Sequence, residues 1–238
     1  MSEVITNLEM ADKLQKDFIN VAAHELRTPI QTITGLIFLL KTKKENILGK
    51  EDEMIDVISR NADRLQKLTE NILYKTKIDS QGVKLSKEKF DINEKIDMFV
   101  KDLSHQNNTN NDIEILSILS EDSIVVNADK IRVYELLSNL LNNAIKFTRY
   151  GKIIISSYID DFSLNSRKSV VVKISDTGIG IHNDLLPMLF TPLITSSSFG
   201  TGLGLFICKS IVEAHGGKIW AENNSDGMGA TFYFLLPL

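Results

Sequence analysis

The glycines are spread so unevenly along this chain that its two ends require different architectures. Nine of the 13 glycines lie between Gly178 and Gly229, whereas residues 1–80 contain only Gly35 and Gly49. Glycine weakens helices but permits tight turns and close backbone approaches, so the first segment favours long helices and the last favours strands and loops. A chain of 238 residues accommodates one large domain or two small ones, and this change in composition favours two.

The turn-forming run Asp79-Ser80-Gln81-Gly82 marks the predicted boundary, which gives domains of residues 1–80 and 81–238. In the first domain, apolar residues recur every three or four positions over 5–41 and over about 51–77, which predicts two helices. The stripes comprise Leu14, Phe18, Val21, Ala22, Ile30, Ile33, Leu36, Ile37 and Leu40, then Met54, Ile58, Ala62, Leu65, Leu68 and Ile72.

The connection between these helices is short, so they should form an antiparallel hairpin. Residues 43–50 are polar and include Gly49, which predicts a turn. Pro29 lies inside the first helix, where its missing N–H predicts a kink or a loosened turn. A lone hairpin leaves its apolar stripe half exposed, so we expect a homodimer through residues 1–80 that forms a four-helix bundle. The alternative is a hairpin packed against the rest of the same chain.

From residue 81 onward, short strands and helices are mixed without strict alternation. This mixture predicts an α+β sandwich with helices layered on one sheet, distinct from the all-α first domain. The predicted strands are 83–90, 113–118, 124–126, 152–158, 170–175, 218–222 and 230–236, and the predicted helices are 91–103, 129–147 and 203–215.

Composition and charge exclude several classes of protein. The chain is 43% apolar and 24% charged, which is typical of a globular protein and not of a disordered one. The net charge is −4 and neither domain is basic, so no nucleic-acid partner is expected. Cys208 is the only cysteine, which excludes an intramolecular disulfide. The apolar run Leu36–Leu40 is too short to span a bilayer and the N-terminus lacks a signal-peptide core, so we expect a cytoplasmic chain.

The first motif that carries chemistry is His24-Glu25-Leu26-Arg27-Thr28-Pro29. Helical geometry turns His24 away from the buried edge near Ala22 and towards solvent. Thr28 lies one helical turn beyond His24, and Glu25 directly follows His24 in the sequence. A neutral imidazole is a competent nucleophile, and a neighbouring carboxylate can orient the ring or accept its proton. A lone surface histidine beside a helix-stabilising glutamate would be the commoner explanation.

The second motif places Asn139, Asn143 and Lys146 on one face of the predicted helix 129–147. Asparagine has a low helix propensity, so two on one face suggest that their carbonyl oxygens are used. Amide oxygens suit Mg²⁺, and a lysine supplies positive charge for phosphates. The alternative is simply the polar outer face of a buried helix.

Two glycine motifs follow. Asp176-Thr-Gly178-Ile-Gly180 comes directly after a predicted strand, where glycines allow a ligand to approach the backbone and the aspartate could accept from an amino group. Gly200-Thr201-Gly202-Leu203-Gly204-Leu205 precedes a helix, whose N-terminus suits phosphate. Its spacing matches neither a dinucleotide fingerprint nor a Walker loop. Each motif alone would also fit an ordinary turn or loop.

Together and in this order, the four motifs resemble the sensor histidine kinases of two-component signalling. His24–Pro29 resembles the phosphoacceptor box of the dimerisation and histidine-phosphotransfer domain. Asn139–Phe147, Asp176–Gly180 and Gly200–Leu205 resemble the nucleotide-binding boxes of the catalytic ATP-binding domain, which is similar in fold to the gyrase, Hsp90 and MutL (GHKL, or Bergerat) ATPases. The resemblance covers about residues 10–238, including the closing Gly229–Phe232.

This resemblance implies an ATP-dependent protein-histidine kinase in which ATP phosphorylates His24. The phosphoryl group would then pass to an aspartate on the receiver domain of a response regulator. Glu25 would act as base or ring orienter, and Asn143 would hold Mg²⁺. Glu25 and Thr28 also resemble the motif of members that dephosphorylate the regulator. The implied ATP-binding residues are Asn139, Asn143, Lys146, Phe147, Asp176, Gly178, Gly180, Gly200, Thr201, Gly202, Leu203, Gly204, Leu205 and Thr231.

The sequence also departs from the family pattern. Leu193 replaces the usual second aromatic after Phe190, and the lid over 191–199 carries no lysine or arginine, which bears on catalytic rate more than on nucleotide binding. No transmembrane or sensor segment is evident, so either a partner delivers the signal or the chain is the cytoplasmic core of a longer membrane sensor. Two other functions stay open: a nucleotide-driven ATPase clamp that does not use His24, and a non-catalytic dimeric scaffold. Phosphate incorporation distinguishes the kinase from both.

Overall fold

The structure is a computed structural model that describes residues 2–42, 50–81, 84–106, 112–120, 122–164, 167–192, 202–225 and 227–238. The chain divides into two compact units. The first comprises Met1–Lys77 with Pro192–Leu203, and the second comprises Ile78–Thr191 with Gly204–Leu238. The two units are built differently, as the uneven distribution of glycine predicts.

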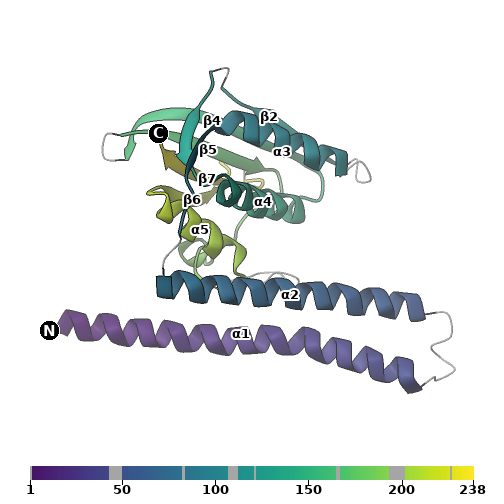
Figure 1. The fold of residues 1–238 in the computed structure, drawn as a ribbon. Coiled ribbons are helices and arrows are strands. Elements are labelled where there is room, and N and C mark those ends of the chain that lie inside the picture. The colour runs from purple at the N-terminus through teal and green to yellow at the C-terminus, as the bar shows by residue number, and fades with distance from the viewer. Residues whose placement is uncertain are drawn as a thin grey trace. The chain divides into compact units, whose positions relative to one another are not determined.

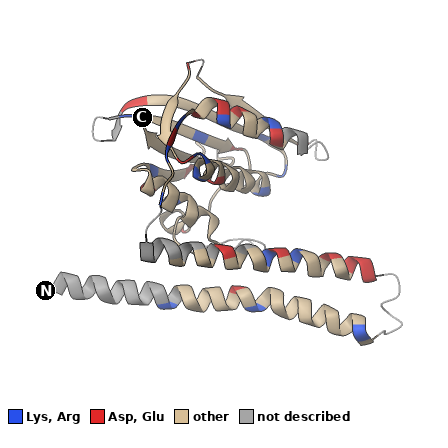
Figure 2. Cartoon of the chain, viewed as in Figure 1, with Lys and Arg blue, Asp and Glu red and all other residues tan. Residues whose placement is uncertain are grey.

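Two long helices, α1 (Ser2–Thr42) and α2 (Glu51–Gln81), make up most of the first unit. They confirm the two helices that the apolar periodicity predicts. Ala22 of α1 and Leu68 of α2 are buried, in agreement with their places in the predicted stripes. The first turn of α2 is acidic (Figure 2), which complements the positive end of the helix dipole. Most of the predicted turn at 43–50 lies outside the described residues.

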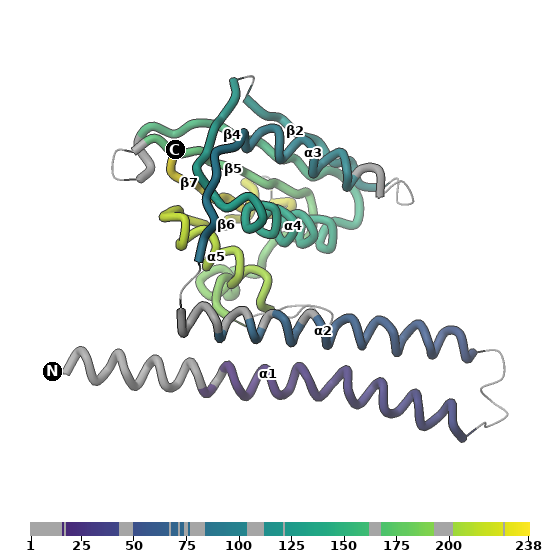
Figure 3. Tube along the Cα trace, viewed as in Figure 1, coloured from purple at the N-terminus to yellow at the C-terminus, as the bar shows by residue number. Residues whose placement is uncertain are grey.

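Pro29 does not interrupt α1. The helix runs through this position without a break, and Figure 3 traces α1 as one continuous coil. Pro29 is buried, so its ring packs inside the hairpin unit even though the carbonyl of Glu25 loses the N–H that would normally bond to it. The structure thus keeps α1 helical through Pro29, and the kink or loosened turn there stays a prediction.

An apolar row remains exposed on the hairpin. Ile19, Ile30 and Ile37 of α1 are exposed and follow one another at intervals of eleven and seven residues, which is the spacing of a helix–helix seam. Ile55 and Leu73 of α2 are exposed as well. Such a row is more apolar surface than a stable isolated hairpin would leave in water.

The end of α2 differs from the prediction. The turn expected at Asp79–Gly82 begins later, because α2 continues through Gln81. Aspartate and serine are weak helix formers but not helix breakers, and glutamine favours helices, so the helix can reach Gln81. The next element, β1, spans Glu88–Asp91 and is shorter and later than the strand predicted over 83–90.

The second unit contains a mixed five-stranded sheet with strand order β2-β4-β5-β7-β6 and a separate ribbon of β1 with β3. Strand β2 pairs parallel with β4, and the other pairs of both sheets are antiparallel. The elements after β1 are α3 (Ile92–Gln106), β2 (Ile113–Ile118), β3 (Val125–Ala128), α4 (Lys130–Phe147), β4 (Gly151–Leu164), β5 (Arg167–Asp176), η2 (Leu186–Met188), α5 (Gly204–Ala214), β6 (Lys218–Asn223) and β7 (Ala230–Pro237).

Helices α3, α4 and α5 cover one face of this sheet (Figure 1). Ile153, Ile174 and Phe234 point into the core beneath them and are buried, whereas alternate residues such as Lys152 and Lys173 lie on the other face. Leu136, Leu137, Leu140 and Leu141 supply the inner side of α4 and are fully buried. The second unit is thus a two-layer α/β sandwich, which confirms the predicted fold class.

Strands β4 and β5 are longer than predicted. The strands were expected to end at residue 158 and to begin again at residue 170, but Asp160 pairs with Ser169 and Leu164 with Arg167, with a shift in register between them. Antiparallel pairing with the neighbouring strand satisfies the backbone here, so it outweighs the low strand propensity of aspartate. The two strands therefore extend as a hairpin ribbon.

A buried histidine joins the end of α5 to the start of α4. The backbone N–H of Asp129 donates to Nε2 of His215 at 2.9 Å, and Nδ1 lies 2.8 Å from the carbonyl of Ile211, so Nδ1 carries the proton. Asp129 caps α4 by accepting from the N–H groups of Ile131 and Arg132. Burial lowers the pKa of His215, because the charged ring would lose water.

We expect the second unit to lose stability as the pH falls. The pKa of His215 is lower in the folded state than in the unfolded chain, so below about pH 6.5 the unfolded state binds the extra proton. Urea unfolding followed by the single Trp220 should give a free energy of unfolding about 1 kcal/mol lower at pH 5.5 than at pH 8. The variant His215→Gln should be less stable at pH 8 but show a flatter profile. An unchanged pH profile in that variant would contradict this assignment.

Among the described residues, no helix is both long enough and apolar enough to cross a membrane.

Candidate functional site

His24 lies on the exposed side of α1, as the helical geometry predicts. The hydroxyl of Thr28 donates to the carbonyl of His24 at 3.3 Å, so it lies one turn further along the same helix. Both side chains are open to solvent. An incoming phosphoryl donor could therefore reach the imidazole without any rearrangement of α1.

Glu25 has a partner that the sequence did not reveal. Its Oε2 accepts a hydrogen bond of 2.8 Å from Nη2 of Arg64 on α2, and both side chains are about four-fifths buried. An ion pair that is largely removed from water has a defined geometry, because a misplaced charge there would be costly. Arg64 therefore fixes the carboxylate next to His24. The 39-residue separation explains why no local motif indicated it.

Helix α4 carries the second motif. Its N-terminus is set by the Asp129 cap, and its inner leucines fix its rotation on the sheet. Asn139 and Asn143 are consequently half-buried and Lys146 is exposed near the C-terminal end. The amide nitrogen of Asn139 donates to the carbonyl of Glu135 at 3.0 Å, which leaves its oxygen on the other side. That oxygen lies 3.0 Å from where a Cβ on Gly204 would stand, so α4 meets the first residue of α5 here.

The amide of Asn143 suits a cation ligand. Among the described residues, its side chain makes no hydrogen bond, and it is half-buried on the same helix as Asn139. The described part of the chain contains no group of three His, Cys, Asp or Glu side chains that could hold a metal by themselves. A Mg²⁺ ion here would therefore need oxygens from a bound phosphate chain besides Asn143, and the hard amide oxygen fits that role.

Asp176 ends β5 with a buried carboxylate. Its Oδ1 accepts from the N–H of Gly178 at 2.9 Å and from that of Ala230 at 3.3 Å. The other oxygen accepts no hydrogen bond from the residues that the structure describes, although the residue is only 5% exposed. Burial raises the pKa of this carboxyl, and the two N–H donors act against that rise. A buried acceptor with one oxygen unused is suited to an amino group of a ligand.

The glycines after Asp176 let this loop approach the end of α4. A Cβ on Gly178 would lie 2.3 Å from the carbonyl oxygen of Phe147, which only glycine avoids. The N–H of Ile179 donates to that same carbonyl at 3.2 Å. Gly180 has a φ of 73°, a left-handed conformation that favours glycine. The structure thus brings the second and third motifs together around the C-terminal end of α4.

The fourth motif is only partly described. Gly200 and Thr201 lie outside the described residues, and Gly202 has a φ of 64°. Leu203 is buried, and α5 begins at Gly204, with Leu205 in its first turn. The predicted helix at this position is therefore confirmed to within one residue at each end. The N-terminus of α5 is suited to an anion.

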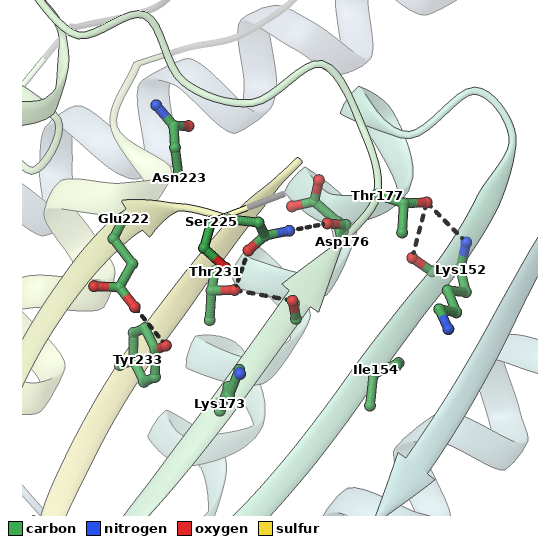
Figure 4. Close-up of a pocket in the computed structure, with 12 residues that line it drawn as sticks. Lys152, Ile154, Lys173, Asp176, Thr177, Glu222, Asn223, Ser225, Thr231 and Tyr233 are labelled. Atoms are coloured by element: carbon green, nitrogen blue, oxygen red, sulfur yellow. Dashed lines mark hydrogen bonds between the residues drawn. The ribbon is translucent and has the colours of Figure 1, made fainter. Parts of the chain in front are cut away.

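Thr231 lies on a different side of the sheet from the carboxylate of Asp176. Its hydroxyl donates to Oδ1 of Asn224 at 2.6 Å and lies 2.9 Å from the hydroxyl of Ser175 (Figure 4). These groups border a cavity of about 570 Å³ on the face that the helices leave uncovered, with Lys152, Lys173 and Tyr233 along its wall. The hydroxyl of Thr231 therefore does not meet Asp176, and a role for Thr231 at the adenine stays a prediction.

Two family models match this chain. Residues 14–81 match the His Kinase A (phospho-acceptor) domain, and residues 128–238 match the histidine kinase-, DNA gyrase B- and HSP90-like ATPase. Together the two models cover about three quarters of the chain.

Curated relatives match over nearly the whole chain. It is 36% identical to sensor protein KdpD of Clostridium acetobutylicum over 95% of this chain and 25% of that protein. It is 29% identical to the autoinducer 2 sensor kinase/phosphatase LuxQ of Vibrio harveyi over 97% of this chain and 27% of that protein. The chain thus spans about a quarter of the length of these relatives.

A solved structure agrees with the family models and with the curated relatives. Histidine kinase ThkA, solved in complex with response regulator protein TrrA, is 29% identical, with a TM-score of 0.74 over 99% of this chain and 65% of that chain. The phospho-acceptor hairpin and the ATPase sandwich occur here in the order that the four motifs predict. The chain therefore belongs to the sensor histidine kinases of two-component systems.

Proposed function

We propose that this chain uses ATP to phosphorylate His24 and then transfers the phosphoryl group to an aspartate on the receiver domain of a response regulator. The observation that carries this proposal is the combination of an exposed histidine on a phospho-acceptor hairpin with an ATPase fold in one chain. The functional division proposed is residues 1–80 for dimerisation and phosphotransfer and 81–238 for catalysis. A cytoplasmic location follows from the use of ATP as donor.

In the first reaction, a ring nitrogen of His24 attacks the γ-phosphorus of ATP. The nitrogen–phosphorus bond forms while the bond to the bridging oxygen breaks, and ADP leaves with that electron pair. The ring becomes cationic and loses the proton on its other nitrogen to the carboxylate of Glu25. Arg64 supports this role, because its hydrogen bond to Oε2 holds the carboxylate in place and leaves Oε1 for the imidazole.

The ATP site is assigned to the helix-covered side of the second unit. Asp176 accepts from the adenine amino group, and Gly178 and Gly180 let the ring approach the backbone. Asn139, Lys146 and the start of α5 at Gly204 hold the phosphates. The remaining proposed contacts come from Asn143, Phe147, Gly200, Thr201, Gly202, Leu203 and Leu205. Thr231, whose hydroxyl lies on the other face of the sheet, would act through Asn224, which accepts from that hydroxyl and donates to the carbonyl of Asp176. Mg²⁺, held by Asn143 and the phosphates, would neutralise charge on the transferred group.

The proposed assembly is a homodimer through residues 1–80. Its support is the exposed row of Ile19, Ile30 and Ile37, which a second copy could cover in a four-helix bundle. The proposed partner is a receiver domain. Its support is the similarity to ThkA, which has been solved with a response regulator.

The kinase proposal is tested by incubating the purified chain with Mg²⁺ and γ-labelled ATP. Label that is lost in acid but stable in alkali is the signature expected of phosphohistidine. Steady hydrolysis of ATP without labelled protein would indicate a nucleotide-driven clamp instead. The absence of both, with nucleotide binding intact, would indicate a scaffold.

A second activity, dephosphorylation of the regulator, is favoured by the Thr28 hydroxyl one turn beyond His24. Thr28 would position the water that attacks the regulator's phosphoaspartate. We expect Thr28→Ala to slow the loss of label from a receiver domain labelled by this chain by about 100-fold, and autophosphorylation to continue. Thr28→Ser, which retains the hydroxyl, should restore most of the rate. Full dephosphorylation by Thr28→Ala would exclude this activity for Thr28.

A further inference from the structure

We propose that Asn223 and Asn224, at the end of β6, are positioning residues that set the selectivity of the ATP site for adenine. This inference rests on the proposed role of Asp176 as acceptor of the adenine amino group. The two asparagines contact no proposed substrate atom. They bind the two ends of the segment Asp176–Ile181, which carries the adenine contacts.

Asn224 holds the first end of this segment. Its amide nitrogen donates to the carbonyl of Asp176 at 2.8 Å and to that of Met228 at 2.7 Å. Its amide oxygen accepts from the hydroxyl of Thr231 at 2.6 Å, and Thr231 in turn contacts Ser175 (Figure 4). Both donor hydrogens and the oxygen are used, so the orientation of the side chain is determined by its partners. Asn224 thereby links the carbonyl of Asp176, at the end of β5, to Thr231 on β7.

Asn223 holds the second end. Its amide oxygen accepts from the N–H of Ile181 at 2.7 Å, and its amide nitrogen donates to the carbonyl of Ile181 at 2.7 Å. A side chain that pairs with both backbone groups of one residue imitates the pairing of a neighbouring strand. Residues 179–183 have no strand partner of their own, so the bonds of Asn223 to Ile181 and the bond from Ile179 to the carbonyl of Phe147 together fix where Gly180 lies.

Two close contacts leave the segment no room to move towards Gly229 or Asn223. A Cβ on Gly229 would lie 2.0 Å from the carbonyl oxygen of Asp176, and a Cβ on Gly180 would lie 3.1 Å from the amide oxygen of Asn223. The backbone is therefore packed tightly against the residues that bind it. A change in the half-buried Asn224 should therefore move the segment, and a change in the exposed Asn223 should loosen its hold on Ile181.

Positioning of Asp176 determines selectivity because ATP and GTP present opposite groups at the same ring position. Adenine offers an amino donor to the carboxylate, whereas guanine offers a carbonyl acceptor, which a fixed carboxylate repels. A site built to hydrogen-bond one group rejects an analogue that lacks it most strongly when the partner cannot shift. Loosening the segment should therefore lower the affinity for ATP much more than the affinity for GTP.

The test compares binding of Mg·ATP and Mg·GTP to the full 238-residue chain by calorimetry. Asn224→Asp replaces a donor with an acceptor that faces two carbonyls, and Asn223→Asp loses only one of its two bonds to Ile181. Asn127→Asp makes the same change of charge at an exposed position on β3 and serves as the matched control. Unfolding followed by Trp220 fluorescence shows that each variant is folded.

We expect Asn224→Asp to weaken ATP binding about 10-fold while GTP binding changes less than about twofold, so the preference for ATP falls about 10-fold. Asn223→Asp should also lower the preference for ATP over GTP. If Asn224→Asp does not fold, Asn223→Asp alone tests the inference. Equal weakening of both nucleotides, or a preference equal to that of Asn127→Asp, would overturn the inference. The proposed ATP site itself fails if the unmodified chain binds neither nucleotide or if Asp176→Asn keeps the full preference for ATP.

Discussion

Replacement of His24 by alanine is expected to abolish the incorporation of labelled phosphate from ATP, by at least about 10⁴-fold. Nucleotide affinity should change by less than about twofold, because none of the ATP contacts proposed above comes from α1, which carries His24. The loss should be this large because the imidazole is the proposed attacking group, and no neighbouring side chain can form the same bond. Glu25 and Thr28 can assist the reaction but cannot replace a nitrogen nucleophile.

The other histidines with described side chains are poor substitutes. His215 is buried, and both of its ring nitrogens are engaged by the backbone. His182 is exposed and lies 3.4 Å from Asp184 on the loop after β5, outside any match to the phospho-acceptor model. His182→Ala is therefore the matched control, and it should retain full labelling. Labelling of His24→Ala at the level of the unmodified chain would contradict the assignment of the nucleophile.

Replacement of Asp176 by asparagine is expected to weaken ATP binding about 30- to 100-fold, which corresponds to the loss of one hydrogen bond to a charged group. In the proposed site the carboxylate has to accept on both oxygens, from Gly178 and Ala230 on one and from adenine on the other. An asparagine has one oxygen and one amino group. Whichever way the amide turns, a donor faces another donor, so either the loop or the adenine loses its partner.

The same residue predicts how ATP binding depends on pH. Burial raises the pKa of Asp176 above the ordinary aspartate value, so its carboxylate takes up a proton earlier on acidification than an exposed one would. A protonated carboxyl competes as a donor with the adenine amino group, so ATP affinity should fall as the pH decreases through that raised pKa. Calorimetry from pH 8 downward measures this, with the exposed Asp184→Asn as control. An ATP affinity in Asp176→Asn equal to that of the control would refute both expectations.

Local patterns were sufficient for the helices. The apolar spacing predicted α1, α2 and α4, because each helix needs one apolar face and that face repeats along a short stretch of sequence. Boundaries were less accurate. The polar residues Asp79, Ser80 and Gln81 were still compatible with a helix, so α2 reached further than predicted.

The extent of the strands depended on partners. Asp160 and Leu164 have little local reason to be in a strand, and they join β4 because β5 lies beside them. The parallel pairing of β2 with β4 also had no signature in the sequence, because it joins segments separated by α4 and β3. Pairing between distant segments supplies the hydrogen bonds that make such residues extended.

The sequence by itself determined the family, the order of the two architectures and the identity of the principal candidate residues. His24, Asn143 and Asp176 could be named because each belongs to a short motif whose spacing is local. Only the tertiary structure decided which groups surround them. Arg64 reaches Glu25 across 39 residues, and Asn224 reaches Asp176 across 48. Such contacts form only after helices and strands have packed, so no local spacing encodes them, and they are the contacts that hold the reactive groups in place.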